Sequence, residues 1–223
     1  MSSRADASPA RPALAVVVWI AALAGAIVLS SAVAQHVRDQ QRAAARAAAT
    51  GNGGSTPAAP ARRFDPASVK PADPRSLFRT SNFARALGIV RRRVGARADV
   101  QQVRLAPGEL QLTVLQGDRA NQLSVDADGD YTVLTTSSVS GTIEAFYLSQ
   151  VHSGVPAALA RRIASQADLP VGRLDYMVVA TDPVAHRHHW LVYPTGGRVH
   201  FQADTASGPI LEYGPHGVHT LGG

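Results

Sequence analysis

Histidines cluster in the last part of the chain, and three of them have the spacing of possible metal ligands: His186, His188 and His200. His186 and His188 alternate along a predicted strand and would share one of its faces, while His200 falls on the strand predicted to lie beside it. Three imidazoles in one place would suit zinc, nickel or copper. The stretch contains no carboxylate to orient the rings, although Asp182 is near, and a hairpin with exposed histidines is the favoured explanation. We therefore assign no metal site and keep these three residues as candidates.

A second group with possible chemistry is the acidic run Asp126, Asp128 and Asp130, whose spacing is that of the start of a calcium-binding loop. In such a loop glycine stands at the sixth position and glutamate at the twelfth. Here glycine stands at the fourth position and Ser137 at the twelfth, which predicts an ordinary turn.

Motifs typical of enzymes are missing from the sequence. It has no cysteine, which excludes thiol chemistry and cysteine-ligated metals. No nucleophile-elbow pattern surrounds any serine, and the glycines at 51–54 do not follow a strand as a phosphate-binding loop requires. We therefore expect no catalytic residue, no cofactor and no enzymatic activity.

The net charge of +6 is confined to the front of the chain. Residues 1–34 carry +1, residues 35–80 carry +5, and residues 81–223 are neutral. A neutral domain has no long-range field to attract a phosphate backbone, so we expect no nucleic-acid partner. The local cluster Arg91–Arg93 is interpreted as a solvated face near the end of a helix, where cations favour the dipole.

The first apolar stretch predicts contact with a lipid bilayer. From Pro12 to Gln35 there are 24 residues without a charge or a histidine, enough for a helix to cross a bilayer. We expect a cytoplasmic tail at 1–12 and a transmembrane helix at 13–35 that acts as an uncleaved signal anchor. The alternative is a secretory signal cleaved after Ala34, since Ala32-Val33-Ala34 fits the processing pattern.

Residues 36–80 are expected to tether the rest of the chain to the membrane. An Ala- and Arg-rich part is followed by glycines and by five prolines between residues 57 and 74, too dense for a helix or a strand. Arginines flank the apolar segment on both sides, so the charge rule hardly decides the orientation. A short tail, one apolar segment and a long domain are typical of a signal anchor, and we expect the domain to lie outside the cytoplasm.

The remaining sequence contains an internal repeat. Apolar residues with helical spacing predict helices at 81–94 and 155–167, which align at an offset of 76 residues. Residues 112–126 align with residues 190–204 without a gap at an offset of 78, and alternating apolar residues predict strands in both. Two nearly equal offsets indicate a duplication with length changes in the loops.

The predicted fold class is α+β: a helix followed by three or four antiparallel strands, present twice. The first repeat spans 81–136, the connector 137–154, the second repeat 155–214, and a flexible tail 215–223. Because the connector is apolar around Phe146 and each repeat is small, we expect the two repeats to pack as one unit.

The second repeat, with the runs ALARRIASQADLPVGRLDYMVV and HHWLVYPTGGRVHFQADTASGPILEY, resembles a PepSY-type unit. Two such units side by side are similar to the fold of the β-lactamase-inhibitor protein. The resemblance implies an exported or membrane-tethered protein that regulates, inhibits or binds another, and it implies no catalytic residues. It leads us to expect a binding or regulatory domain with an unknown envelope protein as partner. A histidine-dependent metal-binding protein and a structural spacer of the cell envelope are the alternatives.

Overall fold

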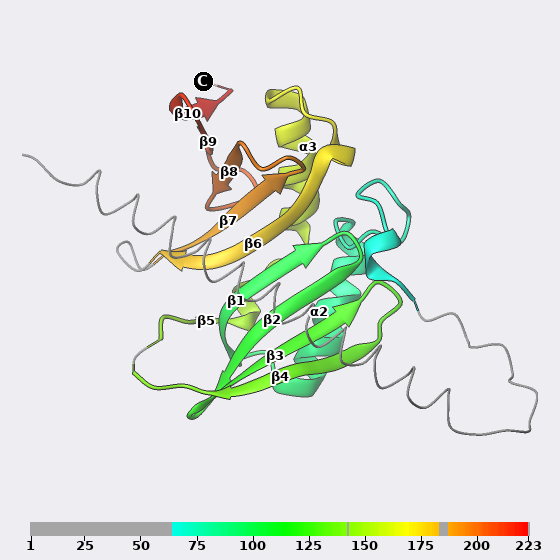
Figure 1. Cartoon of the computed structure of the whole chain (residues 1–223), viewed down its shortest axis with the longest axis vertical. Helices are drawn as coiled ribbons and strands as arrows, with labels where there is room; N and C mark the ends of the chain where they lie inside the picture. Colours follow the sequence, from blue (N-terminus) through cyan, green and yellow to red (C-terminus); the bar gives the residue numbers. More distant parts are fainter. Residues whose placement is uncertain (1–63, 142, 183–186, 223) are drawn as a thin grey trace, which may run out of the picture. The chain divides into compact units, whose positions relative to one another are not determined.

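The computed structural model describes residues 64–141, 143–182 and 187–222 (Figure 1). The expected cytoplasmic tail, the transmembrane segment at 13–35 and most of the tether lie outside these residues, as does His186. Within the described part of the chain, no helix has the length and apolar character needed to cross a bilayer.

The described residues form an α+β fold with one antiparallel sheet and two α-helices, so the predicted fold class is confirmed at that level. Nine strands follow the order β10-β9-β8-β7-β6-β1-β2-β3-β4, and β5 pairs with β1 beside that path. The elements in chain order are η1 Pro66–Ser68, α2 Thr80–Val94, β1 Asp99–Ala106, β2 Glu109–Gln116, β3 Arg119–Asp126, β4 Tyr131–Ser138, β5 Phe146–Tyr147, η2 Leu148–Gln150, α3 Gly154–Gln166, η3 Val171–Arg173, β6 Leu174–Asp182, β7 Arg187–Pro194, β8 His200–Ala203, β9 Ile210–Gly214 and β10 Gly217–Leu221.

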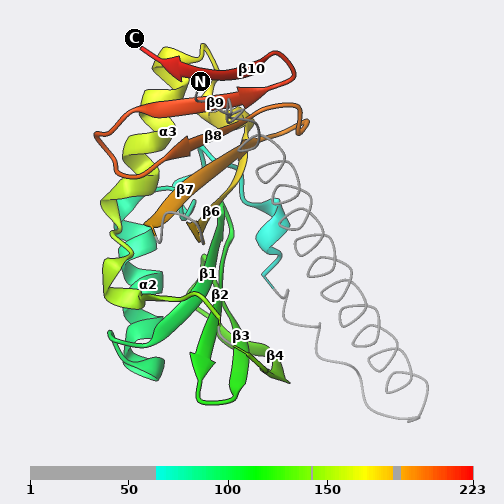
Figure 2. The same cartoon turned by 90° about the vertical axis from the view of Figure 1, so that its left-hand side faces the viewer.

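Both α-helices cover the same face of the sheet (Figure 2). Alternate residues of the strands point to this face and are buried there, as the period of two requires. The helices add apolar stripes at helical spacing, with Phe83 and Leu87 on α2 and Leu159 and Ile163 on α3 fully buried or nearly so. These side chains form one continuous apolar core that extends across both halves of the sheet.

The two halves are joined by backbone pairing between β1 and β6. Leu105 pairs with Met177 and Val103 pairs with Val179, and all four side chains are buried. The sheet therefore continues from one half into the other, in the geometry that a single folding unit would need.

The connector is packed into the junction between the halves. Phe146 pairs with Val100 of β1 and is 6% exposed, and Leu148 is fully buried. Arg91 of α2 donates hydrogen bonds to the carbonyl oxygens of Leu148 and Val151, at 3.4 and 2.9 Å. Arg91 thus fixes the connector to the first helix, which the interpretation of Arg91–Arg93 as a solvated face did not foresee.

The end of the predicted tether is folded instead of extended. Val69, Leu77 and Phe78 are buried in the core, and the Leu77 amide donates a 2.7 Å hydrogen bond to the carbonyl of Pro107. Gly108 permits this contact, because a Cβ atom there would lie 2.0 Å from the carbonyl oxygen of Pro66. The expectation of a tether up to residue 80 is therefore wrong for these residues, since apolar side chains in a proline-rich stretch pack without regular structure.

The expectation of a flexible tail at 215–223 is also wrong. Gly217–Leu221 forms β10, which pairs with β9 from Gly214↔Gly217 to Ile210↔Leu221. Glycine is needed at the turn, because Gly217 has a φ of +110°. The side chains of β10 are mostly exposed, so they show none of the apolar alternation from which a strand is predicted.

The acidic run after β3 is a turn, as predicted. One carboxylate oxygen of Asp126 accepts hydrogen bonds from the backbone amides of Asp128, Gly129 and Asp130, at 2.8 to 3.0 Å. The carboxylate is therefore used to close its own turn, which is a common role of aspartate.

Candidate functional site

The face of the sheet opposite α2 and α3, here called the outer face, is covered by neither of these α-helices (Figure 2). A row of stacked side chains crosses five neighbouring strands on it. We call this row the aromatic ladder. Its members are Arg104 on β1, Tyr176 on β6, Tyr193 on β7, His200 on β8 and Tyr213 on β9.

Strand register places the rings of the ladder side by side. Tyr176 pairs with Tyr193, and His200 pairs with Tyr213. The ring centroids are 4.6 Å apart between Tyr176 and Tyr193, 5.6 Å between Tyr193 and His200, and 4.8 Å between His200 and Tyr213. Every neighbouring pair is within 20° of parallel. Aromatic pairs across strands stabilise a sheet, and here they also fix the ring orientation.

The end of the ladder on the first half is cationic. The Arg104 guanidinium carbon lies 4.5 Å from the centre of the Tyr176 ring, within the range of a cation–π contact. Arg104 therefore connects the ladder to the outer face of the first half.

Burial within the ladder shifts the pKa of its ionisable members toward the uncharged form. It raises the pKa of Tyr193 to about 12, with a smaller contribution from Tyr176. It also raises the pKa of Tyr176 and Tyr213, and it lowers the pKa of His200. At neutral pH the ladder therefore consists of three uncharged phenols, an uncharged imidazole and one guanidinium.

The two halves of the outer face differ in chemistry. Strand register places polar residues on the first half, where the side chains of Gln111 and Ser124 hydrogen-bond to the carboxylate of Glu109, and aliphatic residues next to the ladder on the second half. The polar set is Gln102, Gln111, Thr113, Gln122, Ser124 and Thr132, and the aliphatic set is Val178, Leu191 and Leu211. The outer face thus has an aromatic and apolar half and a hydroxyl- and amide-rich half.

At one edge of the outer face, His189 lies between two carboxylates. Its Nδ1 atom is 2.5 Å from Oδ1 of Asp204, and its Nε2 atom is 3.6 Å from Oδ2 of Asp182. The side chain of His189 is 14% exposed, and Nε2 is buried without a hydrogen-bond partner. This arrangement joins the end of β6 to the turn after β8 through one imidazole.

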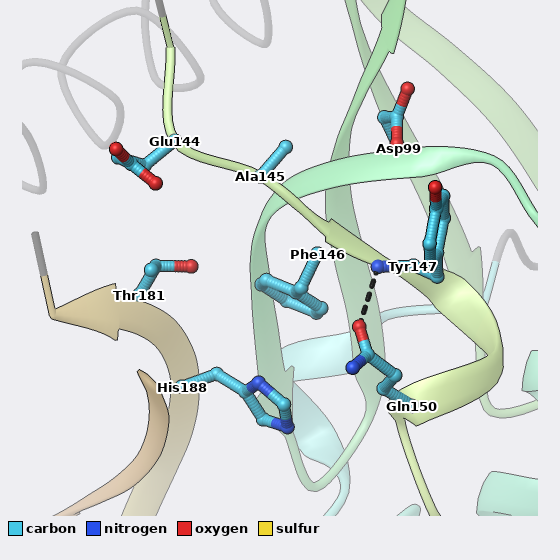
Figure 3. Close-up of a pocket in the computed structure, with 8 residues that line it drawn as sticks. All are labelled: Asp99, Glu144, Ala145, Phe146, Tyr147, Gln150, Thr181 and His188. Carbon is cyan, nitrogen blue, oxygen red and sulfur yellow. Dashed lines mark hydrogen bonds between the residues drawn. The ribbon is translucent and has the colours of Figure 1, made fainter. Parts of the chain in front are cut away.

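Near the same ends of β6 and β7, a cavity of about 280 Å³ lies beside the connector (Figure 3). The lining residues are Asp99, Glu144, Ala145, Phe146, Tyr147, Gln150, Thr181 and His188. The rings of Phe146 and His188 stack there, with centroids 5.4 Å apart. Burial lowers the pKa of His188, and the neighbouring His189 and His152 lower it further, against a smaller opposing effect of Asp204.

The structure separates two of the three candidate metal ligands. His188 stacks on the buried Phe146, whereas His200 belongs to the ladder on the opposite face. His200 pairs with the position of Tyr193, five residues further along β7 than His188, or roughly 16 Å at 3.3 Å per residue. Among the described residues, no group of three or more histidine or carboxylate side chains is arranged to hold a metal ion.

Comparison with known proteins gives little further information. No family model and no curated protein matches the chain. One similar solved structure is that of a "putative lipoprotein" from Clostridium difficile 630, with 10% sequence identity and a TM-score of 0.40. The similarity covers 62% of this chain and 91% of that one. It is too low to assign a family or an activity.

Sequence reasoning missed the aromatic ladder. The alignment of Tyr176, Tyr193 and Tyr213 depends on the pairing register, which alternation along single strands does not give. One signal was available in the sequence. Each tyrosine is an odd number of residues away from a buried residue of the same strand, and side chains at odd spacing point to opposite faces of a sheet.

Proposed function

We propose that this protein is a non-enzymatic binding domain, tethered to the membrane outside the cytoplasm, that holds a partner protein of the cell envelope on its outer face. The observation that carries the proposal is the aromatic ladder. Four rings and one guanidinium lie in a row across five strands on the face that α2 and α3 leave uncovered.

The composition of this face supports a protein as the partner. Tyrosine and arginine are enriched at protein interfaces and among their energetically dominant residues. The ladder has one cation and three phenols that stay uncharged at neutral pH, which suits a surface that must lose its water on binding.

The stacking within the ladder argues against a sugar or a nucleobase as the ligand. Such ligands bind by stacking on the free face of an aromatic ring. In the ladder the rings of Tyr193 and His200 are stacked on both sides, by Tyr176 and Tyr213 among others. At these two residues only ring edges and polar atoms remain for a ligand, and these suit the irregular polar and apolar surface of a protein.

The repeated element order supports the relationship to tandem PepSY-type units as part of the same proposal. In each half an α-helix precedes at least four strands of the antiparallel sheet. In our proposal the apolar segment at 13–35 anchors the domain in the membrane. The residues that follow, from 36 onward, form a tether that lets the domain reach its partner.

Site-specific photo-crosslinking of the full-length protein in intact cells tests the proposal. A photoreactive residue at Gln202, on the outer face beside the ladder, should form one defined adduct with another protein. The same residue at Arg161, exposed on α3, should not form that adduct. Tyr213→Ala should reduce the yield several-fold, and Arg92→Ala, which alters an exposed residue of α2 on the opposite side of the sheet, should leave it unchanged. Equal yields from positions 202 and 161, or no adduct from either, would refute the proposed partner surface.

Reporter fusions at residue 60 test the location. An exported reporter should be active there and a cytoplasmic reporter silent. The opposite pattern would overturn the orientation, and release of a soluble protein beginning at Gln35 would overturn the anchor.

A further inference from the structure

The sheet ends at β10 in an edge that is open to further pairing (Figure 1). Strand β10 stands last in the strand order and pairs with β9 alone. On the side away from β9, its backbone N–H and C=O groups face no other strand of the described chain. Such a row of unpaired groups is a template on which another chain can add a strand.

Strand β10 lacks the features by which natural edge strands avoid pairing. These features are charged side chains, above all lysine, together with proline and β-bulges. Gly217–Leu221 contains no lysine, arginine, acidic residue or proline, and its pairing with β9 runs without a register shift. Val218 is a large hydrophobic residue and is 54% exposed. The edge is therefore regular and partly apolar, and nothing in it repels a second strand.

The opposite edge of the sheet, β4, is built differently. Val133 and Thr135 pair with consecutive residues of β3, which leaves Leu134 outside the register. A bulge of this kind bends the strand and interrupts the regular spacing of its backbone groups. Of the two edges, β10 is therefore the one whose residues can all pair with a further strand.

We propose that β10 pairs antiparallel with β10 of a second copy of this chain, so that the sheet continues from one molecule into the other. The two-fold axis runs perpendicular to the sheet through His219, because paired residues point to the same face and this register pairs all five residues of the strand. Val218 then lies opposite Thr220 of the second copy, and Gly217 lies opposite Leu221. The inference goes beyond the proposed partner surface and does not depend on it.

In this register the edge is complementary to itself. Val218 and Thr220 are both β-branched, a type of residue that is favoured in strands and in cross-strand pairs, and the pair occurs twice by symmetry. Val218 also pairs with Tyr213, so the second copy extends the row of side chains in which the aromatic ladder ends. His219 faces its own equivalent, and each lies beside Glu212 of its own β9. A proton gained by either imidazole therefore has a carboxylate-bearing neighbour.

Closure favours this arrangement over pairing between different edges. Contact between β10 of one copy and β4 of the next would leave a free edge at both ends and would add copies without limit, whereas a two-fold contact closes after two copies. The bulge at Leu134 also opposes such a contact.

The contact is small, so the pair is weak. Five residues span about 17 Å at 3.4 Å per residue, and a sheet layer is about 10 Å thick, which gives a contact of about 170 Å² per copy. A stable interface buries roughly 800 Å² per partner. The two molecules therefore associate transiently, and the experiment must trap the pair.

Disulfide trapping of the full-length protein in nonionic detergent tests the pairing. The chain has no cysteine, so one introduced cysteine reports on one position. Directly opposite residues of paired strands have Cβ atoms about 4.5 to 5.5 Å apart, which a small shift brings into disulfide range. His219→Cys should form a covalent dimer about ten times faster than Val133→Cys on the opposite edge, after each rate is corrected for the reactivity of the thiol with iodoacetamide. Equal rates, or no dimer from His219→Cys, overturn the proposal.

Mixtures of two variants test the register. The positions of Val218 and Thr220 lie opposite each other across the two-fold axis, and neither lies opposite its own equivalent. An equimolar mixture of Val218→Cys and Thr220→Cys should therefore form dimers faster than either variant alone. If each variant alone reacts as fast as the mixture, the strands do not pair in this register and the proposal is wrong.

A charge at the edge separates pairing from folding. Val218→Lys, combined with His219→Cys, puts one lysine from each copy into the junction and should slow dimer formation several-fold. Val133→Lys in the same background is the matched control, because Val133 and Val218 lie on opposite edges and are 53% and 54% exposed. It should leave the rate unchanged, and circular dichroism should show the same fold in both. An equal effect of the two lysines, or no effect of Val218→Lys, overturns the proposal.

Discussion

Arg162 of α3 donates a 2.8 Å hydrogen bond to the carbonyl oxygen of Ala206, in the turn between β8 and β9. Arg85 of α2 makes the same contact with the carbonyl oxygen of Ala127, in the turn between β3 and β4. In the first half, three strands (β1, β2 and β3) lie between α2 and the turn that it contacts. In the second half, three strands (β6, β7 and β8) lie between α3 and the corresponding turn. The repeated contact gives a physical reason why an arginine recurs near this position in both helices.

Removing either contact should destabilise the protein as a whole. Arg85→Met and Arg162→Met each eliminate one charged donor while keeping most of the side-chain length, and each should lower the free energy of unfolding by about 1 kcal/mol. Because the sheet and the core continue through both halves, one cooperative transition should shift in each variant. Urea unfolding followed by circular dichroism measures this. Arg161→Met, at an exposed position, is the control. Two separate transitions would show that the halves unfold independently.

Much of the element order could be predicted from the sequence. The helices at 81–94 and 155–167 are predicted by apolar residues at helical spacing and are found at Thr80–Val94 and Gly154–Gln166. Strands such as β2 and β7 were predicted because one of their faces is buried and the other is not, which produces a clear alternation. The helix predicted from residue 81 begins at Thr80, and Arg79 before it makes no side-chain capping hydrogen bond that would mark the start.

The pairing between the halves could not be predicted, because it depends on contacts far apart in the sequence. Nothing in β1 or β6 alone indicates that Val103 meets Val179. The ladder and the cavity both follow from such register, and therefore both escaped sequence reasoning. The strand β10 escaped it for another reason, since its exposed side chains have no apolar pattern.

The connector should contribute strongly to stability through one residue. Phe146 is 6% exposed and stacks on His188, so Phe146→Ala should lower the free energy of unfolding by about 3 kcal/mol. Its neighbour Tyr147 is 54% exposed, and Tyr147→Ala should change stability by less than about 0.5 kcal/mol. Thermal or urea unfolding of the two variants makes a matched comparison. If both variants unfold like the wild type, Phe146 does not join the halves.

Stability should fall as the pH drops below the ordinary pKa of histidine. Burial lowers the pKa of His188 and of His200 in the folded protein, while in the unfolded chain both titrate near 6.5. The unfolded state therefore binds more protons below this pH, and protonation favours unfolding there. Above it, these two residues add no pH dependence.

The dependence of stability on pH, compared between wild type and a histidine variant, separates the effect of His200 from that of other titrating groups. The urea midpoint of the wild type and of His200→Gln should be compared at several pH values between 5 and 8. The variant loses one ring of the ladder, so its absolute stability will differ. Its stability should nevertheless decline less steeply with acid than that of the wild type. An identical slope in both proteins would show that His200 is not held uncharged by burial.

The phenol of Tyr193 should resist ionisation. Burial between its neighbours raises its pKa from 10.0 to about 12, with a smaller effect of Tyr176. The folded protein retains this proton between the two values while the unfolded chain releases it, so this contribution to stability is complete below pH 10 and is lost as the pH rises toward 12. The phenolate absorbance of the wild type minus that of Tyr193→Phe isolates this titration. We expect its midpoint near 12 in the native protein and near 10 in denaturant. Tyr176→Ala removes one stacked neighbour and should move the native midpoint downward. A native midpoint near 10 in the wild type would mean that the ring of Tyr193 is open to water and that the ladder is not packed as described.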